Sequence, residues 1–421
     1  MGPLTLPSDV LRQLYPRVLA KTLALTRKLS DAEDAVQDAL ERALKSWPEA
    51  GVPDAPEAWL VTVAGNAYRD RLRRVRREEL APDALETLAR MSPWARVALA
   101  ESEVARAWKD ELLRLLFACC HPVLEPGESA ALALATVIGL STSEIASAFL
   151  VNARTMEQRL TRARQRLRER AEYDDDGFTD GERVPAVVTT LHLLFNEGYW
   201  SSSEEGPIRA ELCRLALGLS RSLHEALPAD PEATGLLALM LLHDARRAAR
   251  VDVSGAPMPL PEQDRARWDH AAIRAATELL DEALTRGEPG PFQIEAAISA
   301  VHCRAASADQ TDWQQIAALY ALLENFRSTP AVRVNRAYAV SRAQGPAAGL
   351  TLLEKSSSLD IESYPYVHLV RGTLLAELEQ RDAARAALTL AAQQARNAAE
   401  RTQIRRRLEQ LSVAPETERD R

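Results

Sequence analysis

Residues 140–168, LSTSEIASAFLVNARTMEQRLTRARQRLR, predict two short helices joined by a tight turn. Ser141 followed three residues later by Glu144 forms a capping box, which is typical of a helix start. Asn152 is a suitable cap for the second helix. Apolar residues at helical spacing give the second helix one inward side, which comprises Met156, Leu160, Ala163 and Leu167. The pattern is typical of a helix-turn-helix.

The outward side of the second predicted helix carries polar and positively charged groups suited to contact with DNA. It comprises Arg154, Gln158, Thr161, Arg162 and Gln165. In a helix-turn-helix the N-terminal residues of the second helix lie nearest the bases in the major groove. Arg154 therefore suits the edge of a guanine, and Gln158 the edge of an adenine. The expected phosphate contacts are Arg162, Arg164, Arg166 and Arg168.

Positive charge is concentrated in two places, although the chain has a formal net charge of −8. Residues 69–77 hold six arginines and one aspartate, and residues 154–170 hold seven arginines and two glutamates. Residues 173–421, by contrast, carry 27 lysines and arginines against 36 aspartates and glutamates. Two basic islands in an acidic chain indicate contact with nucleic acid.

Composition excludes several other classes of protein. With 421 residues, 46% hydrophobic and 27% charged, the chain is expected to form several ordinary globular domains. Its longest apolar runs, 130–140 and 236–242, are far shorter than the roughly 20 residues that cross a bilayer. The N-terminus has no secretory pattern. Four scattered cysteines cannot form a disulfide framework, so we expect a cytoplasmic protein with reduced thiols and no membrane contact.

The apolar residues recur with a helical period throughout, which predicts an all-α, multidomain protein. Proline- and glycine-containing breaks fall at 47–56, 81–93, 173–182, 253–261 and 287–291. We interpret the acidic break at 173–182 as the principal boundary.

An acidic helix is expected from Asp31, after a capping box formed by Ser30 and Glu33. Its inward side comprises Val36, Leu40, Ala43 and Trp47, and its opposite side comprises Asp31, Asp34, Asp38 and Glu41. Such a stripe is either a solvated face or a binding surface for a basic partner.

A basic helix is expected to follow, in PEAWLVTVAGNAYRDRLRRVRR at residues 56–77. Leu60, Val63, Ala64 and Ala67 share its apolar side. Asn66, Arg69, Arg73 and Arg76 share the opposite side, where an amide and a row of guanidinium groups suit phosphates and base edges.

The segments DAEDAVQDALERAL, PEAWLVTVAGNAYRDRLRR and 140–168 together resemble, in order and spacing, regions 2 and 4 of the extracytoplasmic-function (ECF) sigma factors of the sigma-70 family. The resemblance covers most of residues 8–172. It implies that the chain binds core RNA polymerase and directs it to promoter DNA, where it helps to melt the DNA and start transcription. The sigma factor itself catalyses no reaction.

The resemblance assigns three groups of residues. Those that bind the clamp helices of the polymerase β′ subunit are Asp34, Gln37, Asp38 and Glu41. Those that recognise the −10 element are Asn66, Arg69, Arg73 and Arg74. Those that recognise the −35 element are Arg154, Thr155, Gln158, Arg159 and Arg162. The sequence departs from the common pattern at Leu150, where many members have glycine, at Asn152, where proline is common, and at Glu157, which replaces a frequent lysine.

The resemblance continues beyond region 4. LLRLLFACCHPVLEP, LHLLFNEGYWSS, LLALMLLHDARRAARVD and DRARWDHAAI look like a sigma-factor subgroup with a long helical C-terminal extension that ends in tetratricopeptide-like repeats. This implies that the extension controls activity through intramolecular contact with the sigma regions. In the best-fitting repeat, from residue 366, Gly372, Ala384 and Ala391 are small residues expected where two helices pack closely.

A metal centre is the rival interpretation for two clusters. His192, Glu197, His243 and Asp244 could form a metal-dependent hydrolase site, but they lack a compact ligand motif. Cys119, Cys120 and His121 have no second pair of ligands at zinc-site spacing, and we interpret these cysteines as buried small residues. We expect no metal, no cofactor and no enzymatic activity.

These inferences define an expected domain plan. Its segments are region 2 at 1–82, a linker at 83–107, region 4 at 108–172, a family-specific helical domain at 182–290, and repeats at 291–415. One alternative from another class stays open: a helix-turn-helix regulator or helical-repeat scaffold that does not engage polymerase. It would bind duplex DNA without supporting an open complex.

Overall fold

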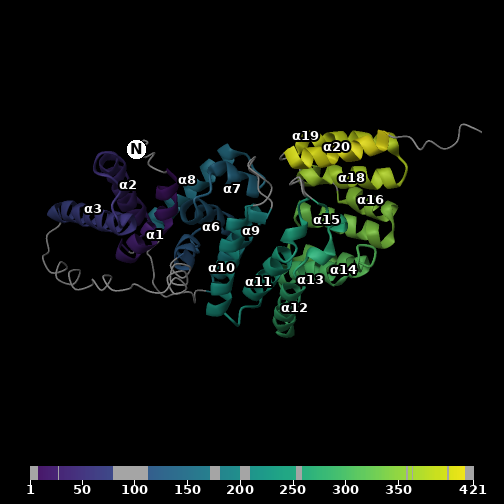
Figure 1. Ribbon diagram of the computed structural model, residues 1–421, viewed down its shortest axis with the longest axis horizontal. Helices are drawn as coiled ribbons and strands as arrows, with labels where there is room; N and C mark the ends of the chain where they lie inside the picture. The colour runs from purple at the N-terminus through teal and green to yellow at the C-terminus, as the bar shows by residue number, and fades with distance from the viewer. Residues whose placement is uncertain are drawn as a thin grey trace, which may run out of the picture. The chain divides into compact units, whose positions relative to one another are not determined.

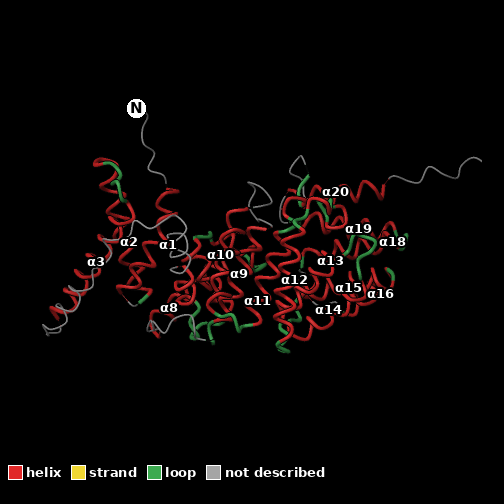
Figure 2. The backbone as a smooth tube through the Cα atoms, turned by 60° about the horizontal axis from the view of Figure 1, so that its bottom comes forward, coloured by secondary structure: helices red, strands yellow, loops and turns green. Residues whose placement is uncertain are grey.

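The computed structural model describes most of the chain as α-helix joined by loops (Figures 1 and 2). The described residues are 8–26, 28–78, 112–170, 181–199, 209–252, 258–356, 359–362, 364–395 and 398–412. They contain no β-strand, which confirms the all-α prediction. Within them, no helix has the length and apolarity needed to cross a bilayer. The expected linker at 83–107 and most of the acidic break at 173–182 lie outside the described residues.

The chain divides into two compact units. Unit 1 comprises residues 1–194 and 221–227, and unit 2 comprises 195–220 and 228–421. Helices α9 (Val184–Tyr199) and α10 (Ala210–Ala226) each contribute residues to both units.

The first part of unit 1 is a bundle of three helices, α1 (Ser8–Thr26), α2 (Leu29–Ala50) and α3 (Pro56–Glu78). Most of the predicted inward residues of α2 and α3 are buried, including Val36, Ala43, Leu60 and Ala64, whereas Leu40 and Val63 are partly buried. Glu57 in the first turn of α3 ties this helix to α1, because its carboxylate lies 2.6 Å from Lys21 Nζ.

The second part of unit 1 contains a helix at residues 112–119, α6 (Pro126–Ala133), the π-helical segment η1 (Leu134–Ile138), α7 (Thr142–Ala148) and α8 (Ala153–Arg170). The N-terminal half of α9 belongs to the same core. Val187 and Leu191 of α9 are fully buried, and Thr190 Oγ1 lies 3.8 Å from Cys120 Sγ. The first turns of the extension therefore complete the packing of the helix at 112–119.

Unit 2 begins with the remaining parts of α9 and α10, followed by α11 (Pro231–Asp244), the short 3₁₀ turns η3 (Arg247–Ala249), η4 (Leu260–Glu262) and η5 (Arg265–Arg267), α12 (His270–Thr285) and α13 (Pro291–Arg304). A carboxylate from α11 caps α13. Glu232 accepts hydrogen bonds from the backbone N–H groups of Phe292 (3.0 Å) and Gln293 (3.1 Å). This contact satisfies two N–H groups that a helix N-terminus leaves without partners.

The rest of unit 2 is a succession of helices: α14 (Trp313–Phe326), α15 (Pro330–Gln344), α16 (Pro346–Lys355), α17 (Leu359–Glu362), α18 (Pro365–Glu377), α19 (Arg381–Gln394) and α20 (Ala398–Ser412). Consecutive long helices pack on one another, as in α14 on α15 and α18 on α19. The small residues singled out in the sequence lie at the second of these contacts. Ala384 and Ala391 are buried, and Gly372 faces Leu388.

Replacement of Gly372 by alanine is expected to lower the stability of unit 2. The added Cβ would lie 2.7 Å from Leu388 Cγ and 3.2 Å from the Ala384 carbonyl oxygen, so α18 and α19 must separate. We expect Gly372→Ala to lower the free energy of unfolding by about 1–3 kcal/mol in urea titrations followed by circular dichroism. Thr389→Ala, at an exposed position of α19, is the control and should change stability by less than about 0.5 kcal/mol. Equal stability of the two variants would contradict the close helix contact.

Candidate nucleic-acid interface

The helix-turn-helix is present, with the caps that the sequence predicts. At the start of α7, Ser141 N donates to Glu144 Oε2 (2.7 Å), and Glu144 N donates to Ser141 Oγ (3.3 Å). At the start of α8, Thr155 N donates to Asn152 Oδ1 (2.8 Å). Both helices therefore begin at side chains that satisfy otherwise unpaired backbone N–H groups.

The turn between α7 and α8 has a left-handed residue at Leu150, whose φ is +54°. This conformation costs a non-glycine residue roughly 1–2 kcal/mol. The Leu150 side chain is also 52% exposed and gains little from burial. The backbone geometry gives a physical reason for the glycine that many related sequences have at this position.

The inward side of α8 is as predicted. Met156, Leu160, Ala163 and Leu167 are all buried. Their burial rotates the other side of the helix toward solvent, and Arg154, Gln158, Thr161, Arg162 and Gln165 are exposed. Thr155 and Arg159, which flank this face, are partly exposed.

The N-terminal half of α8 keeps its polar groups available. In the described part of the chain, Arg154 forms no hydrogen bond or ion pair, and the Arg162 guanidinium donates only to the Gln158 backbone carbonyl (3.3 Å). Two guanidinium groups and an amide therefore project from the first three turns of the helix. This arrangement suits the contact of base edges and phosphates in a DNA groove.

The C-terminal half of α8 is engaged by carboxylates of the same unit. Arg166 Nη1 lies 2.6 Å from Glu128 Oε2 of α6, and Arg168 Nη2 lies 3.5 Å from Asp34 Oδ1 of α2. The sequence predicts phosphate contacts for Arg162, Arg164, Arg166 and Arg168. In this conformation Arg166 and Arg168 face protein carboxylates, and their contact with DNA stays a prediction.

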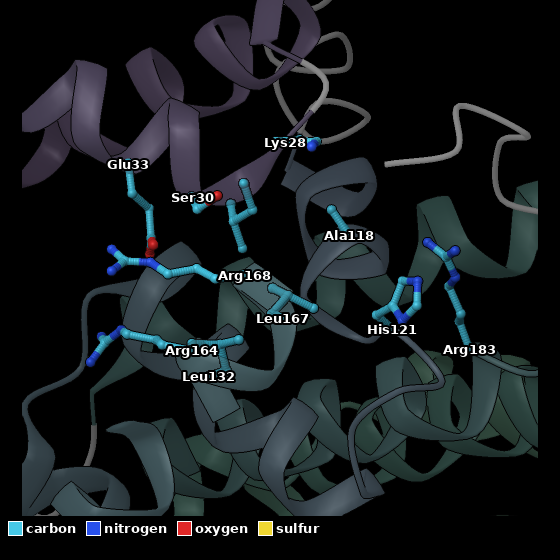
Figure 3. Close-up of a pocket in the computed structure, with 11 residues that line it drawn as sticks. Lys28, Ser30, Glu33, Ala118, His121, Leu132, Arg164, Leu167, Arg168 and Arg183 are labelled. Atoms are coloured by element: carbon cyan, nitrogen blue, oxygen red, sulfur yellow. The ribbon is translucent and has the colours of Figure 1, made fainter. Parts of the chain in front are cut away.

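Glu33 occupies the place where α2 meets α8, and here the sequence prediction was wrong. Helix α2 begins at Leu29, and its N-cap residue, Lys28, forms no side-chain capping bond, so Ser30 and Glu33 do not form a capping box. Instead Glu33 points from α2 toward Arg168 (Figure 3) and accepts a hydrogen bond from Thr136 Oγ1 (3.4 Å). Burial raises the pKa of Glu33, and the positive charges of Arg164 and Arg168 oppose this shift.

The basic face of α3 is exposed where the structure describes it. Asn66 and Arg69 lie on the solvent side of the helix, and Arg69 Nη1 donates to Asn66 Oδ1 (2.8 Å). The side chains of Arg73 and Arg74 lie outside the described residues, although the backbone of α3 continues to Glu78. The described pair offers one guanidinium and one amide on the same turn.

The acidic stripe of α2 is neutralised in part by a residue that the sequence interpretation missed. Arg71 of α3 reaches both Asp34 (Nη1 to Oδ2, 2.9 Å) and Asp38 (Nη2 to Oδ2, 3.1 Å). These two carboxylates stay 43% and 44% exposed. Gln37 and Glu41 are exposed and have no such partner among the described residues. The sequence signal for this contact is the i, i+4 spacing of Asp34 and Asp38, which places both carboxylates within reach of one guanidinium group.

The clusters considered as metal sites have other surroundings. In unit 2 the His243 ring packs against Tyr199, with centroids 5.0 Å apart, and Asp244 Oδ1 lies 3.1 Å from Arg247 Nη1. No group of three or more His, Cys, Asp or Glu side chains suited to a metal ion was found among the described residues.

The four cysteines are buried and unpaired with one another: Cys119, Cys120, Cys213 and Cys303. This agrees with the interpretation of Cys119 and Cys120 as buried small residues. Burial raises the pKa of each of the four thiols, that of Cys120 to about 12 and that of Cys213 to about 11.

Comparison with known families agrees with this geometry. Sigma-70 region 2 matches residues 10–78, which contain α2 and α3, and sigma-70 region 4 matches residues 114–167, which contain α7 and most of α8. A family of unknown function (DUF6596) matches residues 183–284, within the extension.

Two relatives extend the comparison. The chain is 41% identical over 409 residues to an uncharacterized protein of Rhizobium meliloti (strain 1021), covering 96% of this chain and 95% of that protein. It is 28% identical over 164 residues to the ECF RNA polymerase sigma factor SigE of Mycolicibacterium smegmatis, covering 38% of this chain and 60% of that protein. No solved structure matches. The chain therefore belongs to the sigma-70 family, as an ECF-type sigma factor with a C-terminal extension.

Proposed function

We propose that this sigma factor directs core RNA polymerase to two-part promoters and that its own C-terminal extension controls this activity. The observation that carries the proposal is the exposed N-terminal half of α8, where Arg154, Gln158 and Arg162 project from a capped helix. Region 4 would read the −35 element with this face, through Arg154, Thr155, Gln158, Arg159 and Arg162. The first two of the exposed groups suit base edges, and Arg162 suits a phosphate.

Region 2 supplies the other promoter contact. We propose that α3 recognises the −10 element with Asn66, Arg69, Arg73 and Arg74. The exposed side of the helix around Asn66 and Arg69 supports this role, because an amide and a guanidinium on one turn can bond an unstacked base and the adjacent phosphate.

The acidic stripe is the proposed polymerase contact. Asp34, Gln37, Asp38 and Glu41 would bind the β′ clamp helices. Their partial exposure supports this role, as does the ability of Asp34 and Asp38 to hold one guanidinium between them. A basic residue of the polymerase would take the place that Arg71 has in the free chain, where exposed ion pairs contribute only about 0–1 kcal/mol each.

Control by the extension would act through region 4. Its support is the packing of the N-terminal half of α9 on the helix at 112–119, where Arg183 Nη1 donates to the Phe117 carbonyl oxygen (3.5 Å) and Thr190 meets Cys120. Any movement of α9 would be transmitted directly to the core of region 4, because buried side chains cannot shift independently of their neighbours.

The −35 assignment predicts a change in sequence preference. Arg154→Ala or Gln158→Ala should weaken binding to the preferred −35 sequence by about 1–3 kcal/mol and relax base preference there. Arg162→Ala should weaken binding to all sequences alike and reduce the salt dependence. Competitive binding of randomised −35 duplexes to the polymerase holoenzyme measures both effects. Unchanged selectivity in the first two variants would remove α8 from base recognition.

The polymerase assignment predicts loss of holoenzyme. The double variant Asp34→Lys, Asp38→Lys should no longer co-purify with core RNA polymerase, because it places positive charge where the basic partner must bind. The matched control is Glu278→Lys, Asp281→Lys, which makes the same charge change on the exposed side of α12 and should bind normally. If the Asp34→Lys, Asp38→Lys variant still binds core polymerase, the acidic stripe of α2 is a solvated face and not the polymerase contact.

The control assignment predicts that removal of residues 228–421, the larger part of unit 2, changes transcription. A chain ending at Leu227 keeps the parts of α9 and α10 that belong to unit 1, so the core of region 4 stays covered. In reconstituted transcription with core polymerase, this chain and the full chain should differ several-fold in open-complex formation on the same promoter. Equal activity would exclude control by residues 228–421. Absence of open complexes with both chains, despite binding to duplex DNA, would favour a DNA-binding regulator over a sigma factor.

A further inference from the structure

Unit 2 contains a cavity with a volume of about 200 Å³. Its walls come from the 3₁₀ turns before α12, the C-terminal end of α13, the following loop, and helices α14 and α15. A cavity of about 150 Å³ is enough to bind benzene. The space is therefore large enough for a small aromatic molecule that carries a polar substituent.

Aromatic side chains line one side of the cavity. The Trp313 ring makes edge-to-face contacts with His302 (centroids 5.3 Å apart, 78° between planes) and with Tyr338 (5.8 Å, 83°). Each ring is thereby held by another from a different element, which fixes the wall before any ligand arrives. Rings arranged in this way favour a flat aromatic ligand over a flexible aliphatic one.

One cation lies in the lining, and it is held in place by the protein. Arg265 Nη1 donates to the carbonyl oxygens of His302 (2.7 Å) and Ala305 (2.6 Å) at the end of α13. The guanidinium carbon also lies 4.6 Å from the centroid of the Trp268 ring. Neither Nε nor Nη2 of Arg265 donates to a described residue. The N–H groups of these two nitrogens are therefore available to a ligand that accepts hydrogen bonds.

The rest of the lining carries no negative charge, although the exposed carboxylate of Asp309, next to Ala308, acts on Arg265 from outside the lining. It includes no aspartate or glutamate. Burial, assisted by the charges of Arg246 and Arg265, lowers the pKa of His302 to about 4, so this imidazole is neutral at physiological pH. A single positive charge matches a carboxylate better than a phosphate, which carries a charge of about −1.5 to −2 at pH 7.

We infer that this cavity is a binding site for a small aromatic carboxylate, with the ring against Trp313 and Tyr338 and the carboxylate toward Arg265. Asn335, exposed at the rim on α15, adds an amide N–H donor for the ligand. Binding at this site requires only unit 2 and does not depend on the proposed role of the extension in transcription.

Calorimetric titration of the full chain with benzoate, 4-hydroxybenzoate and indole-3-carboxylate tests the inference. At least one of these probes should bind saturably with one site per chain. Two control compounds should bind at least about tenfold more weakly than that probe. One is its carboxamide, which lacks the negative charge, and the other is cyclohexanecarboxylate, which lacks the aromatic ring. Failure of all three carboxylates to bind at millimolar concentration, or equal binding of the neutral analogue, would overturn the assignment.

Two substitutions locate the binding. Ala308→Leu fills the cavity from its loop wall and should weaken binding at least about tenfold, whereas Ala306→Leu, at an exposed position outside the lining, should leave binding unchanged. Asn335→Phe blocks the rim from an exposed helix position and gives a second measurement that does not disturb the core. Unfolding temperatures show that each variant is folded. Undiminished binding in Ala308→Leu and Asn335→Phe would place the ligand elsewhere and overturn the inference.

Discussion

The burial of the apolar stripe of α8 determines the orientation of the charged groups of this helix. Fully burying a side chain such as Leu160 or Met156 contributes about 1.5–3 kcal/mol. Exposed ion pairs such as that of Arg168 with Asp34 contribute about 0–1 kcal/mol. The apolar contacts therefore decide the rotation of the helix, and the arginines take the partners that this rotation offers. Near the N-terminal end of the helix, Arg154 has no hydrogen-bond or ion-pair partner among the described residues. Near the C-terminal end, Arg166 and Arg168 pair with carboxylates.

Exposed ion pairs of small energy are also found on the acidic surface of α2. Arg71 and Arg168 approach Asp34 without burying it, so the arrangement is electrostatically favourable but easily exchanged. Glu33 differs, because it is largely removed from water and its ionised form depends on nearby cations. Neighbouring carboxylates of α2 thus differ in their surroundings. Glu33 is suited to the interior of the unit, and Asp34 and Asp38 are suited to contact with a partner.

Features that depend on a helical period were predictable from the sequence. The inward sides of α2, α3 and α8, the Ser141–Glu144 capping box and the Asn152 cap follow from residues at most a few turns apart. The failures depend on tertiary contact. Glu33 fits a capping box locally, but its carboxylate instead accepts a hydrogen bond from Thr136 Oγ1, 103 residues away. Arg71 belonged to a basic island in the sequence, and only the packing of α2 on α3 brings it to Asp34 and Asp38.

The cavity in unit 2 was invisible in the sequence for the same reason. Arg265, His302, Trp313 and Tyr338 are spread over more than seventy residues and have no motif spacing. Each is also of a type that serves ordinary packing, so no single position marks a site. The close contact of α18 with α19, by contrast, could be anticipated, because Gly372, Ala384 and Ala391 are small residues where the sequence predicts two helices in contact.

The buried thiols have a consequence for the chemistry that the chain can undergo. The thiolate is the form of cysteine that reacts with peroxides and disulfides, and a thiol with a pKa of about 11, such as that of Cys213, is ionised in only about one molecule in ten thousand at pH 7. In the folded state all four cysteines are buried, and burial raises the pKa of each thiol. Oxidants should therefore leave the folded chain unmodified at cysteine, and sensitivity to them would require prior unfolding of the helices that cover the thiols.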